Sequence, residues 1–234
     1  MAQRFLEIKG LNGWYGESHV LHGVDFHVDE GEVVTLLGRN GAGRTSTLRS
    51  IMGLIGTRTG SIKVKGQETV GMATHRIARL GLGYCPEERG IFSSLTAEEN
   101  LMLPPALGEG GMSLEQIYAM FPNLKERAGS QGTRLSGGEQ QMLAVARILR
   151  TGAKLLLLDE ISEGLAPVIV QKLGEVVRAL REQGFTIVMV EQNFRFAAPL
   201  ADRFMVMEHG QVIQQFTQSE LPARMERLHE YLGV

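Results

Sequence analysis

One glycine-rich segment, GRNGAGRTS at 38–46, constrains the fold of this chain more than any other feature. It follows the apolar run EVVTLLG at 32–38 and precedes TSTLRSIMGL, a stretch with helical character. Strand, tight loop and helix in this order are the local structure that a phosphate loop requires. We therefore expect a buried strand at 32–38, followed by a helix that opens at Arg44 and Thr45.

The segment matches the pattern G-x-x-x-x-G-K-[ST], except that Arg44 stands at the lysine position. In such a loop consecutive backbone N–H groups converge on an anion, and the following helix adds its positive N-terminal end. The Thr45 hydroxyl is expected to coordinate Mg²⁺, and the basic side chain to reach the β and γ phosphates. Taken alone, the segment could also be an ordinary glycine-rich turn, so the other motifs must decide.

The composition is that of a globular protein, with 43% hydrophobic and 21% charged residues among 234, and this length suits one sizeable core. A net charge of -2 is not the strongly basic charge that is typical of proteins that bind nucleic acid. The single cysteine, Cys85, cannot form an internal disulfide and agrees with a reducing compartment. No apolar run has the length of a signal peptide or a membrane span. We expect a cytoplasmic chain that spans no membrane.

Apolar runs without polar alternation recur along the chain and are separated by helical stretches. They lie near 82 (LGYCP), at 154–160 (KLLLLDE), at 185–191 (FTIVMVE) and at 203–210 (RFMVMEHG). Such runs suit strands that are buried on both faces, so the pattern predicts an α/β fold with a mainly parallel sheet. Two β-like stretches open the chain, and residues 96–146 read as a helical insertion between two core strands.

A pair of acidic residues ends the apolar run at 154–160. Asp159 is placed at the carboxyl edge of the sheet, where open α/β folds bind their ligands. There it can hold magnesium through water, and Glu160 can orient and polarise an attacking water in phosphoryl transfer. Without the phosphate loop, a simple strand end would be the more common explanation.

The segment LSGGEQQ at 135–141 precedes an amphipathic helix. Ser136, Gly137 and Gly138 offer a hydroxyl and exposed amides at a helix start, which can bind an anion. In isolation, an ordinary helix cap with a Gly-Gly turn would be the better explanation of these residues. Their place between a helical insertion and LLLLDE makes the motif far more specific.

Together these motifs resemble the ATP-binding subunits of ABC transporters, over essentially the full length of the chain. GRNGAGRTS looks like the Walker A loop of that family, LSGGEQQ like its signature motif and LLLLDE like its Walker B strand. The resemblance implies a P-loop (RecA-like) core with an N-terminal antiparallel β subdomain and an inserted helical subdomain. It implies one ABC ATPase domain over 1–234, with core segments at about 1–95 and 147–234 and the helical subdomain at about 96–146.

The resemblance also assigns site residues. Expected to bind ATP are Tyr15, which would stack on adenine, and the loop residues Gly38, Arg39, Asn40, Gly41, Ala42, Gly43, Arg44, Thr45 and Ser46, with Ser136, Gly137, Gly138 and Glu139 acting in trans. Expected in catalysis are Glu160, Gln192 and Arg44, and expected at the metal are Thr45, Glu87 and Asp159. A packed aromatic is the alternative interpretation of Tyr15, or of Trp14 beside it.

The likeness is closest to the branched-chain amino acid importers, and within them to the smaller ATPase of the pair. It rests on CPEERGIF with LTAEENL, on SEGLAP after Walker B and on VEQN after the next strand. Only 42 residues follow Gln192, too few for the regulatory domain that sugar importers often append. The transported molecule is not encoded here, and a urea or short-amide importer is an alternative.

Several switch positions depart from the general family pattern. Glu87 replaces a glutamine that usually contacts the metal, and Gln192 replaces the histidine that usually contacts the γ phosphate. Gln192 can still donate a hydrogen bond but cannot become an imidazolium. Ala166 stands where an aspartate crosses the dimer in many relatives, and Ile161 where proline is common.

Arg44 is the departure with the largest expected consequence. A wide planar guanidinium replaces a compact ammonium, which is not a conservative change at a tight site. It can still bind phosphate, but a positioning error of about 1 Å can cost on the order of 100-fold in rate. The sequence-based hypothesis is that ATP binding survives and hydrolysis is slowed, and an Arg44→Lys change without effect on either would contradict it.

The resemblance implies partners. The signature motif would close over the ATP of a second, related ATPase subunit, with a homodimer as the alternative for the isolated chain. The pair would act on two integral membrane permease subunits at the cytoplasmic face of the inner membrane, and an extracytoplasmic solute-binding protein would deliver the amino acid. A soluble ABC ATPase acting on nucleic acid or ribosomes is the alternative from another class. It usually carries coiled coils, a second module or basic extensions, none of which is visible here.

Overall fold

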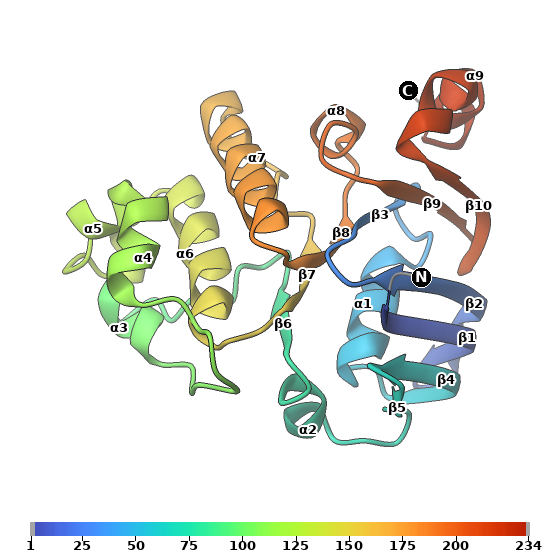
Figure 1. Cartoon of the computed structure of the whole chain (residues 1–234), viewed down its shortest axis with the longest axis horizontal. Helices are drawn as coiled ribbons and strands as arrows, with labels where there is room; N and C mark the ends of the chain where they lie inside the picture. The colour runs from blue at the N-terminus through green and yellow to red at the C-terminus, as the bar shows by residue number, and fades with distance from the viewer. Residues whose placement is uncertain (1–2, 233–234) are drawn as a thin grey trace.

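A computed structural model describes residues 3–232, and its centre is a six-stranded sheet (Figure 1). In spatial order the strands are β10 (Gln211–Thr217), β9 (Arg203–Glu208), β3 (Val33–Leu37), β8 (Thr186–Val190), β7 (Leu155–Asp159) and β6 (Leu82–Cys85). Every neighbouring pair is parallel except β9 and β10, which are antiparallel. The predicted mainly parallel α/β sheet is confirmed.

The three central strands, β3, β8 and β7, are buried at every position. Their side chains alternate between two apolar clusters, one on each face of the sheet. Val33 and Leu37 of β3 belong to one cluster, and Val34 and Leu36 to the other. Because both faces are covered, the strands form a rigid platform for the loops that follow them.

The register of the sheet decides where those loops meet. Asp159 of β7 pairs with Val190 of β8, and Val190 pairs with Leu36 of β3. Parallel strands that end at one level bring the chain segments after β3, β7 and β8 to the same edge. Both the glycine-rich loop and Glu160 therefore lie at the carboxyl edge of the sheet, as the sequence predicts.

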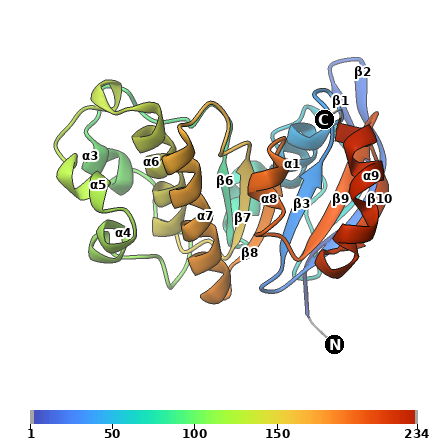
Figure 2. The same cartoon turned by 90° about the horizontal axis from the view of Figure 1, so that it is seen from above.

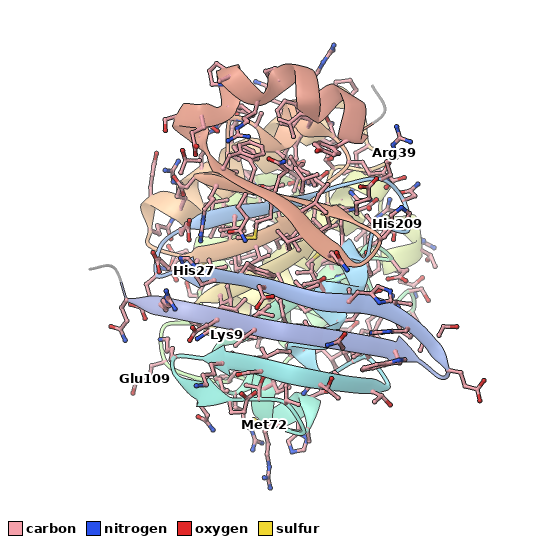
Figure 3. The ribbon with its side chains drawn as sticks, turned by 90° about the vertical axis from the view of Figure 1, so that its right-hand side faces the viewer. Lys9, His27, Arg39, Met72, Glu109 and His209 are labelled. Carbon is pink, nitrogen blue, oxygen red and sulfur yellow. The ribbon has the colours of Figure 1, made fainter. Side chains whose placement is uncertain are left out.

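A second, four-stranded antiparallel sheet has the order β2-β1-β4-β5 and faces the viewer in Figure 3, where Lys9 and His27 are labelled. Its strands are β1 (Arg4–Tyr15), β2 (Ser18–Asp29), β4 (Thr57–Val64) and β5 (Gln67–Glu68). This sheet confirms the expected N-terminal β subdomain. The strands β4 and β10 were not predicted, because both are partly exposed and carry few buried apolar side chains.

The helices are α1 (Arg44–Met52), α2 (Thr74–Ala78), α3 (Ala97–Met102), α4 (Leu114–Met120), α5 (Pro122–Glu126), α6 (Gly137–Arg150), α7 (Pro167–Glu182), α8 (Phe194–Ala197) and α9 (Leu221–Leu232), with 3₁₀ turns at Gly132–Arg134 and Gln218–Glu220. In the chain, α3 to α6 lie between β6 and β7. In space they gather at the end of the molecule opposite β9, β10 and α9 (Figures 1 and 2). The residue limits given above for the helical subdomain remain a prediction.

Candidate nucleotide-binding site

The glycine-rich loop joins β3 to α1, and its geometry explains two of its glycines. Gly38 has φ +153°, and a Cβ there would lie 2.4 Å from the Met207 carbonyl oxygen. Gly43, with φ +102°, would bring a Cβ to 3.0 Å from the Leu21 side chain. A larger residue would displace backbone at the first position and strain the helix start at the second. Helix α1 begins at Arg44, as predicted.

Residues 40–46 of the loop line a cavity of about 420 Å³. The rest of its wall comes from Val20 of β2, from Glu87 after β6, from Glu160 and Glu163 after β7, and from Gln192 after β8. The structure therefore brings Arg44, Thr45, Glu87, Glu160 and Gln192 to one cavity, although they span most of the chain. Gly38 and Arg39 belong to the loop but do not line this cavity. Arg39 and His209, both labelled in Figure 3, line a smaller neighbouring cavity instead.

The Arg44 side chain is only 4% exposed and points at the acidic end of β7. Its Nη2 donates to Glu160 Oε1 at 2.8 Å and to Asn40 Oδ1 at 3.3 Å. Its Nη1 is buried and has no hydrogen-bond partner within the described part of the chain. Leaving a buried donor unpaired costs about 1–3 kcal/mol, and more for a charged group. Burial lowers the pKa of Arg44, although Glu160 and then Asp159 oppose this effect.

Asp159 ends β7 and is completely buried. Its Oδ1 accepts from the Thr45 hydroxyl and its Oδ2 from the Tyr84 hydroxyl, each at 2.9 Å. Burial raises the pKa of the Asp159 carboxyl, and these two hydrogen bonds oppose that rise. Sequence analysis missed Tyr84. The one sequence feature that could have indicated a role for Tyr84 is its hydroxyl near the end of β6, and the structure shows that β6 pairs with β7.

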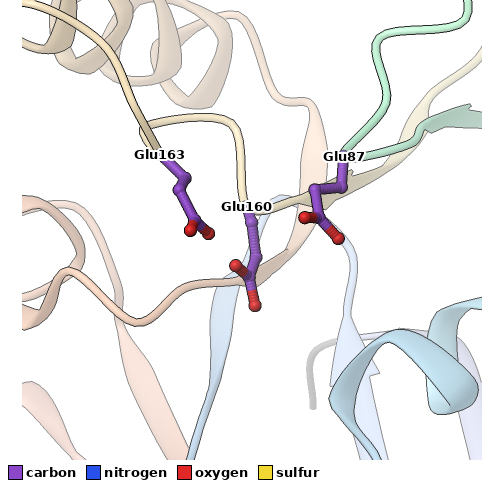
Figure 4. Close-up of side chains that lie close together, drawn as sticks. All are labelled: Glu87, Glu160 and Glu163. Carbon is purple, nitrogen blue, oxygen red and sulfur yellow. The ribbon is translucent and has the colours of Figure 1, made fainter. Parts of the chain in front are cut away.

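Three carboxylates face a common space beside the loop (Figure 4). The nearest side-chain oxygens of Glu87, Glu160 and Glu163 all lie within 4.8 Å of one another. Burial and a hydrogen bond with Glu163 raise the pKa of Glu160 to about 7, against the opposing charge of Arg44. Burial, followed by the charge of Glu163, also raises the pKa of Glu87. Sequence analysis gave Glu163 no role, because its only signal was its place in SEGLAP.

Backbone geometry fixes Glu160 at this point. It has φ +47°, a left-handed conformation that is uncommon for a residue with a side chain. Its N–H donates to the Val190 carbonyl at 2.9 Å, so the turn stays attached to β8. Strained conformations of this kind persist only when the surrounding structure holds them, and they cluster at functional sites.

Gln192 links two parts of the cavity wall. Its Nε2 donates to Asn40 Oδ1 and lies 3.4 Å from Glu160 Oε2. The preceding residue, Glu191, is 1% exposed and accepts from both the backbone N–H and the hydroxyl of Ser162, at 3.1 and 2.7 Å. Burial raises the pKa of Glu191 to about 7. These bonds join the chain after β8 to the turn that carries Glu160.

The signature residues lie elsewhere. Ser136 is the N-cap of α6: its hydroxyl accepts from the Glu139 N–H at 3.3 Å, and its own N–H donates to Glu139 at 2.7 Å. Ser136 and Glu139 line a cavity of about 540 Å³ together with Val168 and Ile169 of α7, and no loop residue lines it. The helix-cap interpretation is thus confirmed as local structure, and the role of Ser136, Gly137, Gly138 and Glu139 toward nucleotide remains a prediction.

Tyr15 ends β1 and is 39% exposed. Hydrogen bonding with Tyr84, and more weakly with Tyr15, raises the pKa of Arg49 above its usual range. Tyr15 is not among the residues that line the loop cavity. Its proposed stacking on adenine therefore stays a prediction.

Comparisons with known proteins identify the class. The sequence profile described as "ABC transporter" matches residues 21–163. The chain belongs to this family, whose members include ATP-binding subunits of transporters. It is 40% identical over 231 residues to the high-affinity branched-chain amino acid transport ATP-binding protein BraG of Pseudomonas aeruginosa, covering 97% of this chain and 99% of the relative.

Two further similarities agree. The chain is 33% identical over 215 residues to the probable branched-chain amino acid transport ATP-binding protein LivF of Archaeoglobus fulgidus, covering 90% of this chain and 91% of that protein. A solved structure described as the ATP binding subunit of an ABC transporter superposes with a TM-score of 0.81 at 28% identity, over 98% of this chain and all of the other. The family assignment made from the motifs is confirmed, and so is the fold class.

Proposed function

We propose that this chain binds and hydrolyses ATP to power the import of branched-chain or related amino acids through an ABC transporter. The observation that carries the ATPase proposal is the single cavity in which a phosphate loop, a buried cation and the Glu160 carboxylate meet. The substrate class rests on the similarity to BraG and LivF.

The residues present fit a nucleotide and a divalent cation. The buried Nη1 of Arg44 has no acceptor within residues 3–232, and phosphate oxygens are acceptors of the right charge. Thr45, Asp159 and Glu87 offer only oxygen atoms, which is the donor set that Mg²⁺ prefers. When bound, Mg²⁺ would neutralise charge that develops on the phosphates.

Each remaining side chain then has a role that follows from its position. Glu160 would orient and polarise the attacking water, and Gln192 would donate its amide N–H toward the γ phosphate. Asp159 and Thr45 already share a hydrogen bond, which keeps the two expected metal contacts in one place.

The separate location of the signature supports a two-subunit site. Ser136 and the loop line different cavities of one chain, so a second ATPase subunit would supply the signature that closes over this ATP. We propose a related subunit as the natural partner and two integral membrane permease subunits as the machinery it drives. No helix within residues 3–232 is long and apolar enough to cross a bilayer. Permease contacts would therefore place the chain at the cytoplasmic face of the inner membrane.

Reconstitution tests this proposal. The chain would be co-expressed with any permease and binding-protein genes found beside its own gene, and the assembly would be placed in liposomes with ATP inside. ATP-dependent uptake of labelled leucine, absent when Asp159→Asn replaces the wild-type chain, is the expected result. Uptake of urea or a short amide instead would shift the substrate class. Genomic neighbours without any membrane protein would point to a soluble ABC ATPase and contradict the transport proposal.

A further inference from the structure

The Arg44 guanidinium has two ends that serve different purposes. Nη2 forms a buried ion pair with Glu160 at 2.8 Å, whereas Nη1 is equally buried and has no partner within residues 3–232. A lysine at this position would have one nitrogen and could not present two separate N–H₂ groups. The feature is thus a consequence of the arginine that departs from the phosphate-loop pattern.

The guanidinium is fixed in place by its neighbours. Asn40 Oδ1 accepts from Arg44 Nη2 at 3.3 Å and also from Gln192 Nε2. Gln192 Nε2 in turn lies 3.4 Å from Glu160 Oε2, and Glu160 Oε1 accepts from Arg44. Arg44, Asn40, Gln192 and Glu160 therefore form a closed hydrogen-bonded ring. A side chain held in this way cannot turn freely to follow a ligand.

Arg44 Nη1, which has no hydrogen-bond partner among the described residues, can take an acceptor from a ligand. The loop cavity is lined by residues 40–46, which include Arg44. In a phosphate loop the backbone N–H groups of such residues bind an anion. A guanidinium forms its strongest hydrogen bonds with carboxylate and phosphate oxygens. Nη2 already has the carboxylate, so a phosphate oxygen is the fitting acceptor for Nη1.

We propose that Arg44 acts as a bridge: Nη2 keeps Glu160 while Nη1 binds a terminal phosphate oxygen of ATP. This inference rests on the proposed ATPase function and adds a second role, in which Arg44 is a positioning residue for Glu160. In this bridged state Glu160 Oε1 still accepts from the Arg44 guanidinium, and Glu160 Oε2 still faces the Gln192 amide. Glu160 is then held away from full engagement with the attacking water, which slows turnover.

Replacement by lysine separates the two roles. A single ammonium drawn to the phosphates leaves Glu160, so the carboxylate gains freedom to engage water. Arg44→Lys is expected to raise kcat by about tenfold while the Kd for Mg-ATP changes by less than about threefold, a change of barrier without a comparable change of binding. Arg203→Lys is the matched control, since Arg203 pairs with Glu32 at the opposite edge of the sheet and should change neither constant.

A double-mutant cycle tests the coupling. Once Glu160→Gln has removed the charged partner, Arg44→Lys should no longer raise kcat, so the two effects are non-additive. Additive effects, or an Arg44→Lys variant with unchanged or lower kcat and intact ATP binding, would overturn the bridge. If the wild-type chain neither binds nor hydrolyses ATP, the proposed function itself fails, which is a different result.

A second measurement does not depend on turnover and follows the wild-type chain, with Arg44→Lys used only to assign the signals. In ¹⁵N-arginine NMR spectra of the wild-type chain, the Arg44 Nη signals are identified by their loss in Arg44→Lys. Adding Mg²⁺ with a non-hydrolysable ATP analogue should shift one Nη signal and leave the carboxylate-paired one in place. A shift of both signals would mean that Arg44 releases Glu160, and a shift of neither would mean that it does not touch phosphate. Either outcome contradicts the bridge.

Discussion

Two regions of this molecule carry the motifs of a nucleotide site, and they are built in opposite ways. The phosphate-loop region buries its charges: Arg44 and Glu160 are 4% and 8% exposed, and one Arg44 nitrogen has no acceptor within the described residues. At the start of α6 the hydrogen bonds are made locally, because Ser136 and Glu139 exchange both hydrogen bonds of a capping box. The first region needs a ligand to be complete, and the second does not.

This difference agrees with the proposal that one chain holds half of a shared site. A loop with a buried, incompletely paired cation is organised for an anion before the anion arrives, which lowers the cost of binding. A self-capped helix start keeps its fold whether or not a partner's nucleotide is present. Substitutions confined to one region at a time can therefore separate the contributions of the two.

The largest effect is expected from Glu160→Gln, which alters only the loop region. Loss of the carboxylate should lower kcat by about 10²- to 10⁴-fold, the usual contribution of a positioned general base. ATP affinity should remain, because the loop and Arg44 are intact. Steady-state hydrolysis and equilibrium ATP binding measure the two quantities, and a Glu160→Gln variant with near-normal turnover would remove Glu160 from the chemistry.

The next effect is on stability, at the start of the loop. A Gly38→Ala methyl would lie 2.4 Å from the backbone carbonyl of Met207, which cannot move aside cheaply. We expect a loss of about 1–3 kcal/mol in the free energy of unfolding. Gly41→Ala is the control, since it has a positive φ but open space around its Cβ. Urea unfolding that ranks Gly41→Ala as the more damaging change would contradict the packing argument.

Glu191→Gln should change how stability depends on pH. The folded pKa of Glu191 is raised to about 7 from 4.5, so the unfolded chain releases this proton first. Wild-type stability should therefore fall relative to Glu191→Gln as the pH rises from 4.5 to 7, by about 1–3 kcal/mol. Unfolding of both proteins at pH 5 and pH 8 measures the difference, and parallel curves would show that the buried carboxylate is ionised throughout.

The smallest stability effect is expected on the other region. Ser136→Ala removes the cap of α6 and should cost about 1 kcal/mol. Ser113→Ala removes the same kind of capping box from α4 and is the matched control. Both should lose similar stability, but only Ser136→Ala should also slow ATP hydrolysis by the assembled transporter. Equal turnover in both variants would leave Ser136 as a helix cap alone.

Much of the fold follows from local sequence. The runs VVTLL, LLLLD and TIVMV are strands because they are apolar throughout, and the loop glycines are fixed by backbone geometry. The position of Asp159 at the carboxyl edge follows from the same pattern. The strands β4 and β10 could not be predicted in this way, because their partly exposed positions carry both polar and apolar side chains. Their pairing also depends on neighbours distant in sequence.

The contacts inside the site could not be predicted in the same way. Tyr84 reaches Asp159 only because β6 and β7 are neighbours, and Glu163 approaches Glu160 only because the chain turns back after β7. Arg44 was recognised as a departure from the loop pattern, but its ion pair joins residues 116 positions apart. Such pairs are set by three-dimensional register rather than by any motif.

Calorimetric titration of the isolated chain with Mg-ATP tests the central claim most directly. The account predicts one ATP bound by the wild-type chain, the same Kd for Ser136→Ala, and a Kd weakened at least about tenfold in Arg44→Ala, the size expected for a lost charged hydrogen bond. No binding by the wild-type chain, or equal weakening by Ser136→Ala and Arg44→Ala, would contradict it, because the two regions would then not be separate halves of a shared site.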